Sequence, residues 1–205
     1  YVDEDADLDK AYDICLDSKV QNVSVCNAME TLLVHASVAP AFLPEMARRF
    51  RESDVRLLGD ESVQRLIACE KATEEDWHTE YLDRVLSIRV VQDLRQAIDH
   101  INHYGSHHTD CIVTENQANA SLFLRSVDSA GVYQNCSTRF ADGFVYGFGA
   151  EVGIATGKIH ARGPMGMEGL TTYKYVLLGH GQTMTEVQQG HIQYTHRDLQ
   201  ETCPI

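Results

Sequence analysis

The sequence contains no apolar run that approaches the roughly 20 residues of a membrane span. Positive charge is also scarce, because 17 lysines and arginines stand against 30 acidic residues and leave a formal net charge of −13. An acidic surface repels the phosphates of nucleic acids and of anionic lipids. We therefore expect neither a nucleic-acid partner nor a membrane partner.

Cysteine pairs of the CxxC type are absent, although the chain has six cysteines. This argues against a zinc-knuckle or thioredoxin-like protein, and we expect reduced thiols in a cytoplasmic protein. The first residues, YVDEDADLDK, are acidic and polar, unlike a signal or transit peptide, and they lack an initiating methionine. We expect residue 1 to lie inside a longer protein.

Helical and strand-like patterns alternate along much of the chain. Apolar residues at helical spacing predict helices at residues 7–19, 41–50, 93–105 and 116–125, with a short one around Val63. Short apolar or β-branched runs predict strands at residues 31–35, 55–59, 84–91, 111–114, 131–135 and 173–178. This alternation is typical of an α/β fold with an open, mostly parallel sheet and covering helices. Active sites of such sheets gather at the carboxyl ends of the strands, where we expect one here.

A glycine-rich stretch at residues 139–169 carries eight glycines and predicts an irregular loop. Within it, GFGAEVG (residues 147–153) imitates a dinucleotide-binding fingerprint. A true fingerprint follows a strand and opens a helix early in a βαβ unit. Because this one comes late, we reject it as a phosphate site. We expect its glycines to allow close backbone approach to a ligand or a neighbouring domain.

Cys26 lies in a short polar segment, SVCNAMET, between a predicted helix and a predicted buried strand. Backbone N–H groups of such a segment can lower the pKa of a thiol and make it a nucleophile. A free cysteine is more often a small buried apolar residue, and the local residues alone leave both interpretations open.

Four histidines cluster in the segment HINHYGSHH, at His100, His103, His107 and His108. No carboxylate or cysteine stands at a zinc spacing from them. A polar helix end, where cationic histidine suits the helix dipole, is the better interpretation, and we predict no metal site.

Four stretches, taken together, resemble the gamma-glutamyl phosphate reductases of the aldehyde dehydrogenase superfamily. They are VCNAMETLLVH from Val25, AIDHINHYGSHHTDCIVTE from Ala97, NCSTRFADG from Asn135, and GFGAEVGIATGKIHARGPMGMEGLTTYKY ending at Tyr175. Their order and spacing fit the family from the start of the chain to about residue 180. The same enzyme also forms the second half of bifunctional pyrroline-carboxylate synthases.

The resemblance implies the aldehyde dehydrogenase fold, with a dinucleotide-binding domain, a catalytic domain and an oligomerising extension. It implies the reduction of L-glutamate 5-phosphate by NADPH to glutamate 5-semialdehyde and phosphate, in proline synthesis, and a homo-oligomer. Residues 1–178 would be the catalytic domain, including a strand that returns toward the cofactor domain, and residues 179–205 a C-terminal tail. The cofactor domain would mostly precede residue 1, so we expect this chain alone to bind NADPH poorly and to turn over little.

The resemblance also implies roles for single residues. The family nucleophile matches Cys26, which would form a thioacyl-enzyme, while backbone N–H groups and the Asn27 amide hold the oxyanion. Glu80 matches by position the glutamate that the superfamily uses against the nicotinamide ribose. The family's substrate loop matches Asn135, Ser137, Thr138 and Arg139. Either Arg139 or Ser137 would hold the α-carboxylate or the phosphate.

Two departures from the family pattern occur near that loop. Cys136 stands where we expect a small residue, which would put a second thiol near the pocket, and DGFVYGFG differs from the usual glycine-glutamate form. Two other functions stay open. One is a non-catalytic oligomerisation or interaction module derived from this fold, and the other is a hydrolase that pairs Cys26 with a histidine such as His35.

Overall fold

The computed structural model describes residues 1–195 and forms two units, which are described separately. The first unit is Tyr1–Thr171, and it contains all the strands that the described residues form. The second unit begins at Thr172. None of the described helices is both long and apolar enough to cross a membrane.

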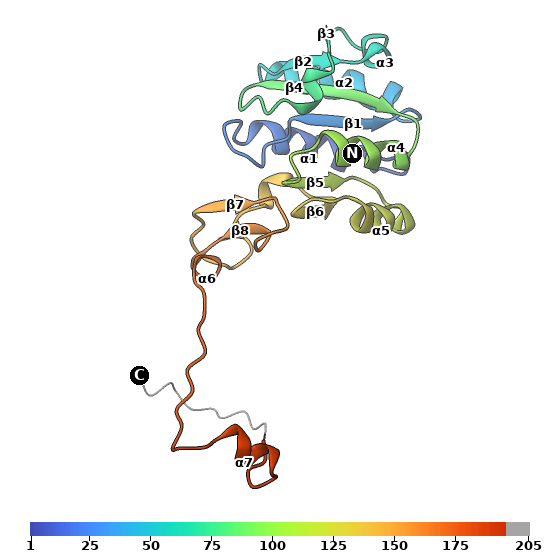
Figure 1. Ribbon diagram of the computed structural model, residues 1–205. Coiled ribbons are helices and arrows are strands. Elements are labelled where there is room, and N and C mark those ends of the chain that lie inside the picture. Colours follow the sequence, from blue (N-terminus) through green and yellow to red (C-terminus); the bar gives the residue numbers. More distant parts are fainter. Residues whose placement is uncertain (196–205) are drawn as a thin grey trace. The chain divides into compact units, whose positions relative to one another are not determined.

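Parallel pairing dominates the strands of the first unit (Figure 1). A four-stranded sheet has the order β1-β4-β2-β3, and a separate pair joins β5 to β6. All of these pairs are parallel. The strands are β1 (Thr31–His35), β2 (Arg56–Gly59), β3 (Glu70–Lys71), β4 (Val85–Val91), β5 (Thr109–Ile112) and β6 (Gly131–Gln134). The predicted α/β fold with a mostly parallel sheet is confirmed.

The N-terminal segment joins the two groups of strands. Val2 forms parallel bridges to Val34 of β1 and to Val113, directly after β5. The Val2 N–H donates to the Leu33 carbonyl at 2.9 Å, and the Asp3 N–H donates to the Val113 carbonyl at 3.1 Å. The six strands and the N-terminal segment therefore make one continuous array of hydrogen-bonded neighbours.

Carboxylate or amide side chains cap the start of four helices of the first unit. A carboxylate or amide oxygen accepts hydrogen bonds from the backbone N–H groups that the first turn leaves free. The caps are Asp7 before α1 (Leu8–Val20), Asp60 before α3 (Glu61–Gln64), Asp93 before α4 (Leu94–Tyr104) and Asn116 before α5 (Gln117–Ser126). Helix α2 (Ala39–Glu52) has no such cap and begins with a proline in its first turn.

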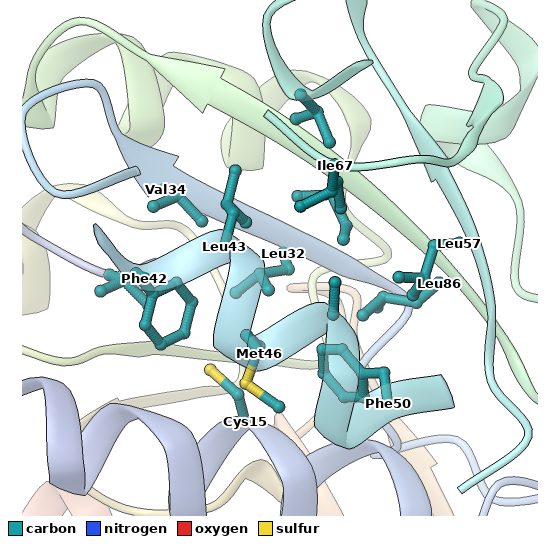
Figure 2. Packing of buried hydrophobic residues seen from close by; sticks show 14 of the residues in the cluster. Cys15, Leu32, Val34, Phe42, Leu43, Met46, Phe50, Leu57, Ile67 and Leu86 are labelled. Carbon is teal, nitrogen blue, oxygen red and sulfur yellow. The ribbon is translucent and has the colours of Figure 1, made fainter. Parts of the chain in front are cut away.

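Two apolar clusters lie on the two faces of the sheet, because successive residues of a strand point to opposite sides. Leu32 and Val34 of β1 pack against α1 and α2, where Phe42 and Met46 are fully buried (Figure 2). Leu33, between them, packs with α4 and α5 on the other face. Helix α1, fixed in this way, carries the chain back to the amino ends of the parallel strands.

Two predicted elements differ from the structure in position or kind. The strand expected at residues 111–114 begins two residues earlier as β5, because Thr109 already pairs with Gly131 of β6. It ends at Ile112, because Val113 pairs with the N-terminal segment instead. The stretch at residues 139–169 is not an irregular loop throughout. It holds the end of η2 (Thr138–Phe140), the antiparallel pair β7 (Gly153–Ala155) and β8 (Gly163–Met165), and the short helix α6 (Met167–Leu170).

The strand predicted at residues 173–178 does not form in this structure, and its return toward a cofactor domain stays a prediction. These residues have no regular secondary structure and their side chains are exposed. A strand needs a neighbour for its backbone hydrogen bonds, and none of the strands in residues 1–195 pairs with this segment. Among its described residues, 172–195, the second unit forms one short helix, α7 (Met184–Gln188). The predicted boundary after residue 178 stays a prediction, and the last ten residues of the predicted tail lie outside the described part.

Candidate active site

Cys26 lies in the loop that connects α1 to β1, and its side chain is exposed. The loop is tied to α1 near its end: the Met29 N–H donates to the Ser18 carbonyl at 2.8 Å. An ion pair between Lys19 Nζ and Glu30 Oε2, at 2.6 Å, adds a second tie. The loop is therefore fixed close to both of its ends while the thiol stays open to solvent.

Asn27, next to the thiol, is buried and held from both sides. Its Nδ2 donates to the Ala141 carbonyl at 2.8 Å, and its own carbonyl accepts a 2.7 Å hydrogen bond from the Thr138 hydroxyl. The Thr138 N–H in turn donates to Ser18 Oγ at 3.2 Å. One of the two Nδ2 hydrogens is thus used within the fold, and Asn27 Oδ1 is buried with no hydrogen-bond partner among the described residues.

His108 is the side chain that the structure brings against the thiol. Its Nε2 lies 3.2 Å from Cys26 Sγ, and its Nδ1 lies 2.8 Å from Thr109 Oγ1. The ring is buried, with 7% of the residue exposed. His107, just before it, adopts the left-handed backbone region at a φ of 60°, which is uncommon outside glycine and turns the chain into β5. Sequence reasoning noticed His108 only as one member of a histidine cluster and missed this contact.

The electrostatic surroundings keep the thiol and the imidazole neutral. Partial burial raises the pKa of Cys26, and the carboxylates of Glu151 and Glu80 raise it further, while a hydrogen bond from the Cys26 backbone N–H and the charge of Arg139 lower it. Burial also lowers the pKa of His108. Near neutral pH the pair therefore consists of a protonated thiol and an uncharged imidazole, so a proton must leave the thiol before it can act as a nucleophile.

A pocket that is open to solvent surrounds the thiol. Its lining includes Cys26, Asn27, Thr138, His108, Glu80 and Trp77. Glu80 is exposed, and its carboxylate has no hydrogen-bond partner within the described part of the chain. Four of the side chains chosen from the sequence thus share one pocket although three separate segments supply them.

The other three residues of the predicted substrate loop lie outside the pocket lining. Ser137 Oγ is buried against Ser18 Oγ at 3.2 Å, and Arg139 Nε donates to Gln21 Oε1 at 2.8 Å, both beside α1. Asn135 is engaged by Thr114, whose N–H donates to Asn135 Oδ1 at 2.9 Å at the end of β6. Their roles toward a substrate stay predictions.

Of the predicted site residues, Cys26, Asn27 and Glu80 lie, together with His108, at the opposite edge of the sheet from the one expected, whereas Asn135 follows β6 at its carboxyl end. Cys26 precedes β1, Glu80 precedes β4 and His108 precedes β5, so all three lie at the amino ends of parallel strands. The expectation of the carboxyl ends is wrong here, because α1 returns the chain to the amino edge and the thiol lies in the connection that enters β1.

The histidine cluster separates in the structure. His100 is buried on α4, His103 is exposed on the same helix, and His108 faces the thiol. Within residues 1–195 no group of three histidine, cysteine, aspartate or glutamate side chains is arranged to hold a metal ion. His35 does not line the pocket: it lies at the carboxyl end of β1, with Nδ1 2.7 Å from Ser37 Oγ. The pairing of Cys26 with His35 is therefore wrong.

Known proteins resemble this chain closely. No family model matches it. The gamma-glutamyl phosphate reductase of Acetivibrio thermocellus is 53% identical over 205 residues, which are 100% of this chain and 48% of that protein. The chain is homologous to the gamma-glutamyl phosphate reductases. It spans about half the length of the curated relatives that it matches.

Solved structures agree with this assignment and with the predicted fold. The gamma-glutamyl phosphate reductase of Thermotoga maritima superposes with a TM-score of 0.84 at 46% identity, over 89% of this chain and 44% of that one. Lactaldehyde dehydrogenase of Escherichia coli superposes with a TM-score of 0.54 at 19% identity, over 66% of this chain and 38% of that one, which shows the fold alone. The predicted resemblance to gamma-glutamyl phosphate reductases and the aldehyde dehydrogenase type of fold are confirmed.

Proposed function

We propose that this chain is the cysteine-bearing catalytic part of a gamma-glutamyl phosphate reductase of proline biosynthesis, and that Cys26 is its nucleophile. The observation that carries the proposal is the solvent-open thiol of Cys26 in a loop tied at Lys19 and Ser18, with His108 at 3.2 Å. Homology to reductases of that name supplies the substrate class.

The chemistry of an acyl phosphate suits a thiol. The sulfur attacks the acyl carbon of L-glutamate 5-phosphate, a C–S bond forms, and the C–O bond to the phosphate breaks. Splitting the reduction into acyl transfer and a later hydride step replaces one high barrier by two lower ones. Backbone N–H groups of the Cys26 loop and the second Nδ2 hydrogen of Asn27 would stabilise the oxyanion, and Arg139 or Ser137 would hold the phosphate or the α-carboxylate.

The Glu80 carboxylate is the feature of the pocket that suits a nicotinamide cofactor. Glu80 presents an exposed carboxylate on the lining of the pocket, free of hydrogen bonds to the described residues, and a carboxylate is a good acceptor for the two hydroxyls of a ribose. When bound, NADPH would supply the hydride that reduces the thioester. Because these 205 residues span about half of their relatives, we propose that on their own they bind NADPH weakly and turn over little. We expect the protein in the cytoplasm.

The direct test is acyl transfer to the thiol in a single turnover. L-Glutamate 5-phosphate, made in situ from glutamate and ATP by a kinase, is mixed with the chain, and phosphate release and protein mass are followed. We expect a burst of phosphate and a glutamyl adduct on Cys26. Cys26→Ser should abolish both, whereas Cys69→Ser, a matched change of another free cysteine, should keep both. No adduct on Cys26 in the unaltered chain would reject the nucleophile and favour a non-catalytic interaction module.

A second measurement tests the weak cofactor binding. NADPH fluorescence is titrated with the chain, and turnover is followed by NADPH oxidation. Strong quenching at micromolar protein together with rapid, sustained oxidation would show that these residues suffice for the whole reaction, against the proposal.

A further inference from the structure

The contact between His108 and Cys26 has the geometry of an acid–base pair. A 3.2 Å separation between Nε2 and Sγ is within hydrogen-bond distance for sulfur. Residues 26 and 108 come from loops at the amino ends of β1 and β5, and both line the same pocket. The imidazole therefore lies beside the thiol in the pocket that would receive a substrate.

Thr109 and burial together fix the ring in the state that can accept a proton. In a neutral imidazole only one nitrogen carries hydrogen. If Nδ1–H donates to Thr109 Oγ1, at 2.8 Å, then Nε2 offers its lone pair to the thiol hydrogen. The partner of Nδ1 is a hydroxyl and not a carboxylate, so nothing at that nitrogen holds a permanent positive charge on the ring, in agreement with the lowered pKa of His108.

The groups around the thiol favour its protonated form, so a proton acceptor at hydrogen-bond distance would assist nucleophilic attack. Burial, Glu151 and Glu80 disfavour the thiolate, and they are opposed by the hydrogen bond from the Cys26 backbone N–H and by the charge of Arg139. On balance the thiol keeps its proton near neutral pH, so a base within reach would take up that proton during attack. His108 is the group at hydrogen-bond distance.

We propose that His108 is the general base that takes the thiol proton of Cys26 during attack and the general acid that then gives it to the departing phosphate. The S–H bond breaks as an N–H bond forms at Nε2, giving an imidazolium while the C–S bond forms. The C–O bond to the phosphate then breaks, and the imidazolium proton moves to the phosphate oxygen, which leaves neutral His108 and a thioester. The identity of the acyl phosphate in this inference rests on the proposed function. The transfer of the thiol proton to His108 is independent of the substrate.

The experiment measures alkylation of Cys26 by iodoacetamide between pH 5 and 9 in the full chain, read by mass spectrometry without substrate or NADPH. As the pH is raised from 5, the alkylation rate of the unaltered chain should begin to increase below pH 6.5, where His108 loses its proton. His108→Gln should remove that increase and slow alkylation at pH 7 by about tenfold or more. The matched control is His103→Gln, an exposed histidine of the same cluster, which should change nothing.

A second variant separates proton transfer from simple packing. In His108→Ala, free imidazole added at millimolar concentration should restore much of the alkylation rate of Cys26, because it can occupy the vacated space and accept the proton. Circular dichroism checks that each variant is folded. If the folded His108→Gln chain alkylates at the unaltered rate, or if imidazole restores nothing in a folded His108→Ala chain, His108 is not the base.

The single-turnover assay of acyl transfer distinguishes the two proposals. If the unaltered chain forms the glutamyl adduct and His108→Gln forms it as fast, this inference fails while the proposed function stands. If the unaltered chain forms no adduct but its alkylation depends on His108, the acid–base pair stands and the proposed substrate fails.

Discussion

Lys19 and Glu30 form an ion pair, Nζ to Oε2 at 2.6 Å, between the last turn of α1 and the residue before β1. The Lys19 side chain is fully buried, and the Glu30 side chain is 16% exposed. Burial lowers the pKa of Lys19 and raises the pKa of Glu30, against the mutual attraction that favours both charges. The pair closes the loop that presents Cys26, so its loss affects both stability and the thiol.

Lys19→Met should strongly destabilise the protein, because it leaves the Glu30 carboxylate buried without its cation. Breaking a buried pair on one side costs about 3–5 kcal/mol of unfolding free energy. The double variant Lys19→Met/Glu30→Leu should recover most of that loss, since neither charge is then buried alone. Urea denaturation measures all three chains. Lys10→Met, which breaks an exposed pair with Glu115, is the control and should change little. Equal stability of the single and double variants would contradict the argument.

The apolar cluster between α2 and the sheet supplies a second prediction. Phe42 is fully buried and stacks on Tyr12 with ring centroids 5.0 Å apart. Phe42→Ala removes this contact and leaves a cavity, which should lower the free energy of unfolding by about 3–5 kcal/mol. Phe144, at 72% exposure, is the matched control, and Phe144→Ala should leave the denaturation midpoint where it was. Similar midpoints for the two variants would show that the cluster is not the main core.

Charges around the thiol predict opposite effects on its reactivity. Glu151 raises the pKa of Cys26 and Arg139 lowers it. Glu151→Gln should therefore speed alkylation of Cys26 at pH 7 by about two- to fivefold, and Arg139→Gln should slow it by a similar factor, as expected for charges near a solvent-exposed group. Both effects should shrink in high salt, which screens exposed charges. A change of the same sign in both variants would mean that loop geometry and not charge controls the thiol.

Local signals made much of the fold predictable. Asp93 and Asn116 are strong helix caps, and α4 and α5 begin at the residues directly after them. The apolar run at residues 31–35 became β1 with the same bounds. In each case the cause lies within one or two turns of the chain, so the sequence pattern contains it.

Features that depend on distant partners were not predictable in this way. Val2 pairs with Val34 and Val113, and no local pattern marks it as the link between two groups of strands. His108 and Cys26 are 82 residues apart, and only the parallel order of β1 and β5 brings both loops to one edge. The run at residues 173–178 has strand-like composition, but a strand also needs a neighbour, and composition does not supply one.

His100 predicts how stability depends on pH. It is 6% exposed, Arg89 Nη1 lies 2.9 Å from its Nδ1, and its Nε2 is buried with no partner among the described residues. Burial, assisted by the positive charge of Arg89, lowers the pKa of His100 from 6.5 to about 4. Between pH 6.5 and 4, His100 is therefore mostly protonated in the unfolded chain and mostly neutral in the folded chain. Stability from this group is present above pH 6.5 and is lost as the pH falls below it.

At pH 5 this histidine should make the unaltered chain about 2 kcal/mol less stable than at pH 7.5. His100→Gln keeps an acceptor for Arg89 and cannot titrate. The stability lost between pH 7.5 and pH 5 should therefore be about 2 kcal/mol smaller in this variant than in the unaltered chain. Urea denaturation of both chains at the two pH values gives the difference directly, and acid effects shared by all other groups cancel in it. His103→Gln, on the exposed side of the same helix, should behave like the unaltered chain. If His100→Gln loses as much stability as the unaltered chain between pH 7.5 and 5, His100 is not the buried neutral group that its contacts describe.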